Sequence, residues 1–154
     1  MNQIEEVRKR LQHVDAIWVA GKWSFHFKSK KFQSSLFEEL AKMEQLGKPV
    51  LLFAQVPMLD GNVQRSRRLL LLGLEQSSSV NEEYQTSNQR LLELTASRNQ
   101  VDYFDGSHLR LFESAPFLNG DLIYFDSHHL NEVGLTAYAK QATEAIESWV
   151  ESNF

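Results

Sequence analysis

The chain has 154 residues, of which 42% are hydrophobic and 23% charged, so it has the composition of an ordinary globular protein with one sizeable core. Its net charge of −4 gives no positive field for nucleic acid, and the cluster Arg65, Arg67 and Arg68 is too short to indicate one. The lack of cysteine excludes disulfides and thiolate metal sites. No apolar run approaches the roughly 20 residues that span a bilayer, and the charged start, residues 1–11, lacks the pattern of a signal peptide.

The first part of the chain alternates helical and strand patterns. Apolar residues at helical spacing predict a helix over 4–14, and the apolar run 16–20 has the character of a buried strand ended by Gly21. A second helix is predicted over 36–46, with Gly47 at the position just after its end. Residues 50–56 give the strongest strand pattern, and Pro57 ends it.

Residues 58–78 give an ambiguous pattern, in which 67–72 fits either a short helix or an inserted flap. Ser79 and Glu82 have the spacing of a capping box, which predicts a helix running from there to Thr95. Residues 101–104 form the third predicted strand.

After that strand, residues 122–125 form a short extended piece and Asn131 suits the N-cap of a last helix. The apolar face of that helix is expected in the core; it consists of Tyr138, Ala142, Ala145, Ile146 and Trp149.

Helices that alternate with strands predict an α/β fold with a mainly parallel sheet. In such open sheets, sites gather in the loops beyond the carboxyl ends of the strands. Four loops are expected at that rim: Gly21–Trp23, Gln55–Pro57, Asp105–His108 and Asp126–His129.

The most informative segment is the one around Asp126 and His129. A serine nucleophile needs a neutral imidazole as base, and the imidazole needs a carboxylate to fix its tautomer. In a tight loop, an aspartate three residues before a histidine can hydrogen-bond one ring nitrogen, and the other ring nitrogen then faces the site. A surface turn that merely caps the following helix is the competing interpretation.

Asp126-x-x-His129-Leu130-Asn131, followed by Gly134 and an alanine-rich helix, resembles the last motif block of SGNH (GDSL-type) esterases and acyltransferases. Residues 14–23 resemble the third strand of the SGNH domains fused to membrane O-acyltransferases (acyltransferase family 3). Segments 47–57, 88–92 and 101–105 match the following elements of that family in order.

The resemblance covers about residues 14–149 and implies a flavodoxin-like three-layer sandwich. It implies that His129 is the catalytic base and Asp126 its orienting acid, whereas His128 lacks the Leu-Asn pair that must follow directly. Gly21 and Trp23 stand where the family's third block has asparagine, and we expect them to bind substrate, with Trp23, Phe25, His26 and Phe27 as an aromatic rim suited to the faces of sugars. Packing of Trp23 beneath its loop is the equally weighted alternative.

Two family blocks are missing: the Gly-Asp-Ser nucleophile and the glycine block of the oxyanion hole. The first strand here already matches the family's third. We therefore expect residues 1–154 to form a single, N-terminally truncated SGNH-like domain that is inactive alone.

The resemblance implies transfer of acyl, above all acetyl, groups to or from hydroxyls of a cell-surface carbohydrate, with no cofactor. It implies association with a membrane acyltransferase domain and an extracytoplasmic location. A non-catalytic interaction domain is the main alternative, with homodimer formation through the sheet edge beside strand 15–20.

Other features receive plainer interpretations. Asp105-Gly106-Ser107-His108 contains the letters of a nucleophile motif, but Asp-Gly is ordinary turn chemistry. A metal site at the histidines is not expected, because adjacent histidines usually point in different directions. A solvated surface is favoured for Arg65, Arg67 and Arg68 over contact with an anionic glycan or lipid. Residues 69–72 are expected in a core or an interface rather than in a membrane, because the run is too short to span one.

Overall fold

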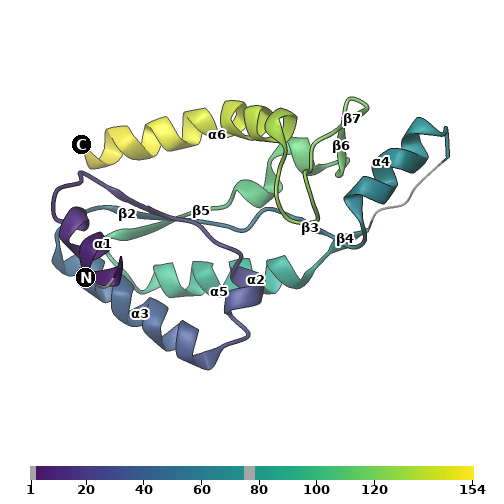
Figure 1. Cartoon of the computed structure of the whole chain (residues 1–154). Coiled ribbons are helices and arrows are strands. Elements are labelled where there is room, and N and C mark those ends of the chain that lie inside the picture. Colours follow the sequence, from purple (N-terminus) through teal and green to yellow (C-terminus); the bar gives the residue numbers. More distant parts are fainter. Residues whose placement is uncertain (1–2, 75–78) are drawn as a thin grey trace. The chain divides into compact units, whose positions relative to one another are not determined.

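The computed structural model describes residues 3–74 and 79–154 (Figure 1). The chain divides into two compact units. Unit 1 contains Met1–Gln55 and Thr86–Asp105, and unit 2 contains Val56–Gln85 and Gly106–Phe154. Among the described helices, none is long and apolar enough to cross a membrane.

Unit 1 is built on a three-stranded sheet in the order β1-β2-β5, formed by β1 (Ile17–Val19), β2 (Val50–Phe53) and β5 (Val101–Phe104). Both pairings are parallel, which confirms the predicted α/β class and sheet. Parallel strands are covered by helices and therefore read as continuous apolar runs, as residues 50–53 do.

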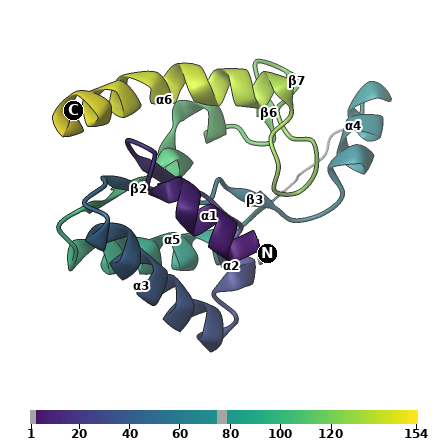
Figure 2. The same ribbon diagram turned by 60° about the vertical axis from the view of Figure 1, so that its left-hand side comes forward.

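The helices of unit 1 are α1 (Gln3–Leu11), α2 (Trp23–His26), α3 (Lys30–Gln45) and most of α5 (Glu83–Ala96). Figures 1 and 2 show α3 and α5 next to each other along the sheet. Their buried leucines join the strand side chains in one core, which contains Ile17, Trp23, Phe27, Leu40, Val50, Leu52, Leu91 and Val101.

Both ends of α3 have residues that are typical of helix ends. The Ser29 hydroxyl accepts a hydrogen bond from the Phe32 backbone N–H at the start. Gly47 has a φ of 66° just after the end, which is the left-handed conformation that glycine adopts without steric cost.

A buried hydrogen-bond network in unit 1 joins Gln55, which follows β2, to Ser24 in α2 and Asn88 in α5. Backbone N–H of Gln55 donates to the Asn88 side chain, and the Asn88 amide donates back to the Gln55 carbonyl. The Gln55 side chain in turn accepts from the Ser24 N–H and donates to its hydroxyl. Each of these buried polar groups has a partner, as burial requires.

Unit 2 contains two small antiparallel pairs. One joins β3 (Met58–Leu59) with β4 (Val80–Asn81), and the other joins β6 (Phe117–Leu118) with β7 (Asp121–Leu122). Its helical elements are α4 (Val63–Leu71), the 3₁₀ turns η1 (Gly106–His108) and η2 (Arg110–Phe112), and α6 (Glu132–Asn153). The core of this unit consists of Leu59, Val63, Leu111, Phe112, Ile123 and Tyr124.

Three local predictions differ from the structure. The cap of α5 is Asn81, whose side chain accepts from the Glu83 N–H, whereas the Ser79 hydroxyl bonds to Asp60. Of the two alternatives for 67–72, a short helix or a flap, the structure has the helix, as part of α4. Its last leucines are exposed, which contradicts a core position for them but not an interface. In α6 only Ala142 of the predicted apolar face is fully buried, and Ala145 is exposed.

Candidate functional site

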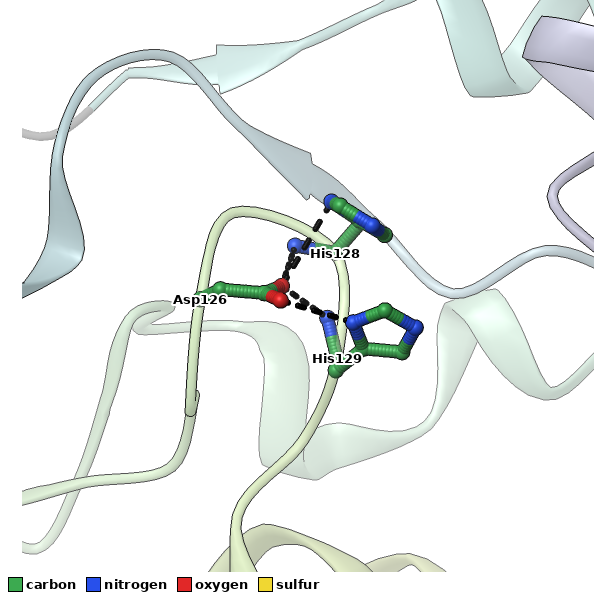
Figure 3. A group of neighbouring side chains, drawn as sticks. All are labelled: Asp126, His128 and His129. Atoms are coloured by element: carbon green, nitrogen blue, oxygen red, sulfur yellow. Dashed lines mark hydrogen bonds and ion pairs between the residues drawn. The ribbon is translucent and has the colours of Figure 1, made fainter.

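The candidate site is a tight loop in unit 2 that carries Asp126 and His129 (Figure 3). A backbone bridge between Tyr124 and Leu130 closes the loop. The Nδ1 atom of His129 lies 2.7 Å from Oδ2 of Asp126, and the other carboxylate oxygen accepts the backbone N–H groups of His128 and His129, both at 2.8 Å. The two predicted residues are therefore in direct contact.

The hydrogen bonds determine the charge of Asp126. Partial burial acts to raise the pKa of its carboxyl group, but the His129 ring and the two backbone N–H groups outweigh burial and lower the pKa from 3.8 to about 2. Asp126 is therefore an anion at every physiological pH.

A carboxylate can only accept hydrogen bonds, so the short contact requires that Nδ1 of His129 carries a proton. In the neutral ring, Nε2 is then the atom with the free lone pair. Figure 3 shows this nitrogen on the side of the ring away from Asp126. The His129 side chain is 66% exposed, so Nε2 is open to a reacting group.

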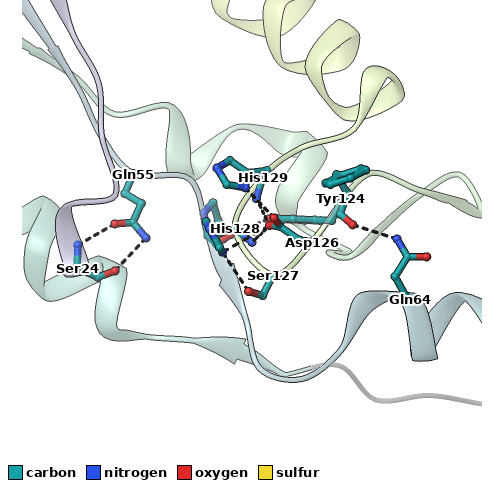
Figure 4. A network of polar contacts seen from close by, with 10 residues as sticks. Ser24, Gln55, Gln64, Tyr124, Asp126, Ser127, His128 and His129 are labelled. Atoms are coloured by element: carbon teal, nitrogen blue, oxygen red, sulfur yellow. Dashed lines mark hydrogen bonds and ion pairs between the residues drawn. The ribbon is translucent and has the colours of Figure 1, made fainter. Parts of the chain in front are cut away.

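Contacts from elsewhere in unit 2 hold the loop in place (Figure 4). The Leu59 N–H donates to the Ser127 carbonyl at 2.8 Å, and the Gln64 side chain donates to the Phe125 carbonyl at 3.2 Å. Sequence reasoning did not find Leu59 or Gln64, because both act from more than 60 residues away along the chain.

Asn131 and Gly134 join the loop to α6. The Asn131 side chain caps the helix by accepting from the Gly134 N–H at 2.9 Å, and it donates to the Leu122 carbonyl at 2.6 Å. A Cβ atom on Gly134 would lie 2.2 Å from the Ile123 carbonyl oxygen. The spacing Asn-x-x-Gly is thus required for the helix to begin directly against the loop.

His128 lies in a different environment. Its Nδ1 is 3.1 Å from the Ser127 hydroxyl and 3.4 Å from Asp126 Oδ1, so it has the longer of the two contacts with the carboxylate. Ligand atoms of Asp126, His128 and His129 lie within 4.8 Å of one another, so the donor set could approach one cation. The prediction that no metal belongs to the site remains a prediction.

Gly21 and Trp23, predicted to bind substrate, belong to unit 1. Trp23 is only 2% exposed and donates from Nε1 to the Phe53 carbonyl at 2.8 Å, so the packing interpretation describes its position. Phe25, two residues later, is the strongly exposed aromatic of this segment, and Gly21 is exposed.

Ser107 does not have the position of a nucleophile. It is 6% exposed within η1. The Tyr138 side chain lies so close to the preceding Gly106 that a Cβ atom there would be 2.2 Å from its hydroxyl. The turn interpretation of this segment therefore fits better than the alternative in which Ser107 replaces the missing serine nucleophile.

Comparison with known proteins identifies the family of the chain. The family model described as the SGNH domain fused to AT3 domains matches residues 1–144, and the chain therefore belongs to the SGNH domain family. No curated protein sequence shows a significant match to the chain.

A solved structure from Streptococcus pneumonia, described as a candidate platelet activating factor, has a similar fold with a TM-score of 0.53 and 19% identity. The match covers 86% of this chain but 59% of that one. The likeness shows a shared α/β fold, and the chain spans less than two thirds of the length of its structural neighbour.

Proposed function

We propose that this chain supplies the acid–base half of an SGNH-type acyl-transfer site, with His129 as the base and Asp126 as its orienting acid. The single observation that carries the proposal is the 2.7 Å contact between His129 Nδ1 and Asp126 Oδ2, which leaves an exposed Nε2. Membership of the SGNH family supports this assignment of roles.

In the proposed reaction a serine hydroxyl attacks the carbonyl of an acyl donor while Nε2 of His129 takes its proton. The proton then passes to the leaving group, and the acyl group remains on the serine as an ester. The acceptor hydroxyl next gives its proton to Nε2 and attacks that ester, which transfers the acyl group and restores the serine. Asp126 stabilises the charged imidazolium at each step.

The substrate class we propose is an O-acyl group, above all acetyl, on a hydroxyl of a cell-surface carbohydrate. The same site could either transfer the acyl group to that hydroxyl or remove it by hydrolysis. The family description, fusion to AT3 domains, supports action beside a membrane acyltransferase domain on the extracytoplasmic side. The sequence printed here holds no Gly-Asp-Ser block, so we propose that this chain alone does not turn over esters.

The first test is the coding DNA upstream of Met1. An in-frame Gly-Asp-Ser segment allows the longer protein to be expressed and assayed with p-nitrophenyl acetate. We expect His129→Ala to lower kcat/KM by at least about 10³-fold, whereas the matched control His128→Ala retains most of the activity. Equal losses in both variants, or none in His129→Ala, would contradict the assignment.

A non-catalytic interaction domain is the second candidate. Within the described residues, β1 has a strand neighbour on one side only, and Trp18 on it is 54% exposed. An open strand edge can pair with another chain, so we propose a homodimer through β1. Sedimentation equilibrium of the chain tests it: a dimer that Trp18→Lys, an added charge at an exposed position of this edge strand, converts to a monomer supports the proposal, and a monomeric parent chain rejects it.

A further inference from the structure

We propose that the end of α4 is a membrane-docking knob that inserts its leucines into a bilayer containing anionic lipid. The knob consists of Arg65, Arg67 and Arg68 together with Leu70, Leu71, Leu72 and Leu74. It lies in unit 2 but takes no part in the acid–base chemistry proposed above, so the two proposals can fail independently.

The first observation is how α4 is attached. The Asn62 side chain caps its start by accepting from the N–H groups of Gln64 and Arg65, and Val63 and Ser66 are buried in unit 2. The opposite end is exposed, with Leu71 at 78% and Leu72 at 71%. Figure 1 shows α4 extending beyond β3 and β4, the strands on either side of it in the chain.

The second observation is that backbone hydrogen bonds close the exposed end of α4. Gly73 has a φ of 68°, its N–H donates to the Leu70 carbonyl, and the Leu74 N–H donates to the Leu69 carbonyl. These two bonds form a Schellman cap. The leucines are therefore held outward by a closed helix end, and a cluster of exposed leucines on a globular protein indicates a binding surface.

The third observation is the order of charge and apolar surface along the helix. Arg67 and Arg68 stand four residues before Leu71 and Leu72, so each arginine lies on the same face as a leucine, one turn of about 5.4 Å nearer the domain. When the leucines enter the acyl region, the guanidinium groups reach the headgroup level.

Charge complementarity favours anionic lipid as the occupant. Residues 61–74 contain three arginines and no acidic residue, although the chain as a whole has a net charge of −4. Within residues 3–74 and 79–154, none of these three arginines forms an ion pair with a carboxylate. The local positive charge is thus available to lipid phosphates.

Flotation with vesicles tests the proposal. Vesicles of phosphatidylcholine with 30% phosphatidylglycerol are expected to bind the parent chain, and vesicles of phosphatidylcholine alone to bind it at least about tenfold more weakly. Leu71→Ser with Leu72→Ser should lower binding at least about tenfold, because the apolar insertion is lost. Both side chains are exposed, so the variant should unfold at the same temperature as the parent.

The charge variant Arg65→Gln, Arg67→Gln and Arg68→Gln should remove the preference for phosphatidylglycerol. Its matched control, Lys30→Gln, Lys31→Gln and Lys140→Gln, removes the same charge from exposed positions elsewhere and should change binding less than about twofold. The proposal is overturned if the parent binds neither vesicle, or if the control loses as much as the arginine variant. It is also overturned if the leucine variant binds vesicles as strongly as the parent does. A leucine variant whose only change is from dimer to monomer would overturn it as well, because the knob is then a contact between protein chains.

Discussion

Two polar networks in this chain look alike in their bonds and differ in what surrounds them. In unit 1, Ser24, Gln55 and Asn88 are buried and joined by hydrogen bonds. In unit 2, Asp126 and His129 are bonded just as closely, but their side chains are 39% and 66% exposed and Nε2 faces outward. A network in which every group has a partner stabilises a fold, whereas one with a basic atom left open can perform chemistry.

The difference between the two networks depends most on Asp126. In the longer protein with the serine block, Asp126→Asn should lower kcat for ester turnover by about 10³- to 10⁴-fold. Asparagine can accept the backbone N–H groups and keep the loop, but its amide can donate to Nδ1, which then favours the wrong tautomer of His129. ¹⁵N chemical shifts of the ring, measured in parent and variant, report the tautomer. An unchanged tautomer with full activity would remove Asp126 from the mechanism.

The buried network should respond in stability instead. Asn88→Ala leaves the Gln55 N–H and carbonyl without their partners, so the free energy of unfolding should fall by about 2–4 kcal/mol. Urea titration measures the loss. Gln89→Ala, next to it on the exposed side of α5, is the matched control and should cost less than about 1 kcal/mol. Similar losses in both variants would show that the network is not what stabilises this end of β2.

Contacts between residues close together in the sequence could be predicted from it, whereas contacts between distant residues could not. Asp126 and His129 are three residues apart, so their contact depends on one loop and could be predicted from spacing and family resemblance. The burial of Trp23 depends on Phe53, 30 residues away, and no pattern around Trp23 reports it. The same limit explains why a capping box at Ser79 was expected where Asn81 is the cap, since Asp60 engages the serine.

Gly134 supports the site loop without taking part in its chemistry. Gly134→Ala should lower the free energy of unfolding by about 2–3 kcal/mol, because the new methyl group meets the Ile123 carbonyl oxygen and the backbone has to move. Ala139→Gly, at an exposed position of α6, loses mainly helix propensity and should cost about 1 kcal/mol. Thermal unfolding of the two variants gives the difference, and a neutral Gly134→Ala would mean that α6 can shift freely at its start.

The smallest effect is the pH dependence that Asp126 adds to stability. Its pKa of about 2 lies below the ordinary value of 3.8, so the carboxylate favours the folded state above about pH 4. That contribution is lost as the pH falls from about 4 through 2, where the folded carboxyl group takes up its proton. Solvent screens the half-exposed pair, so the loss should stay below about 1 kcal/mol. Urea titrations at pH 6 and pH 3 should show a smaller decrease for Asp126→Asn than for the parent. An identical decrease in both would mean that other carboxylates alone account for the acid sensitivity, and that the His129 contact adds nothing to the stability of the fold.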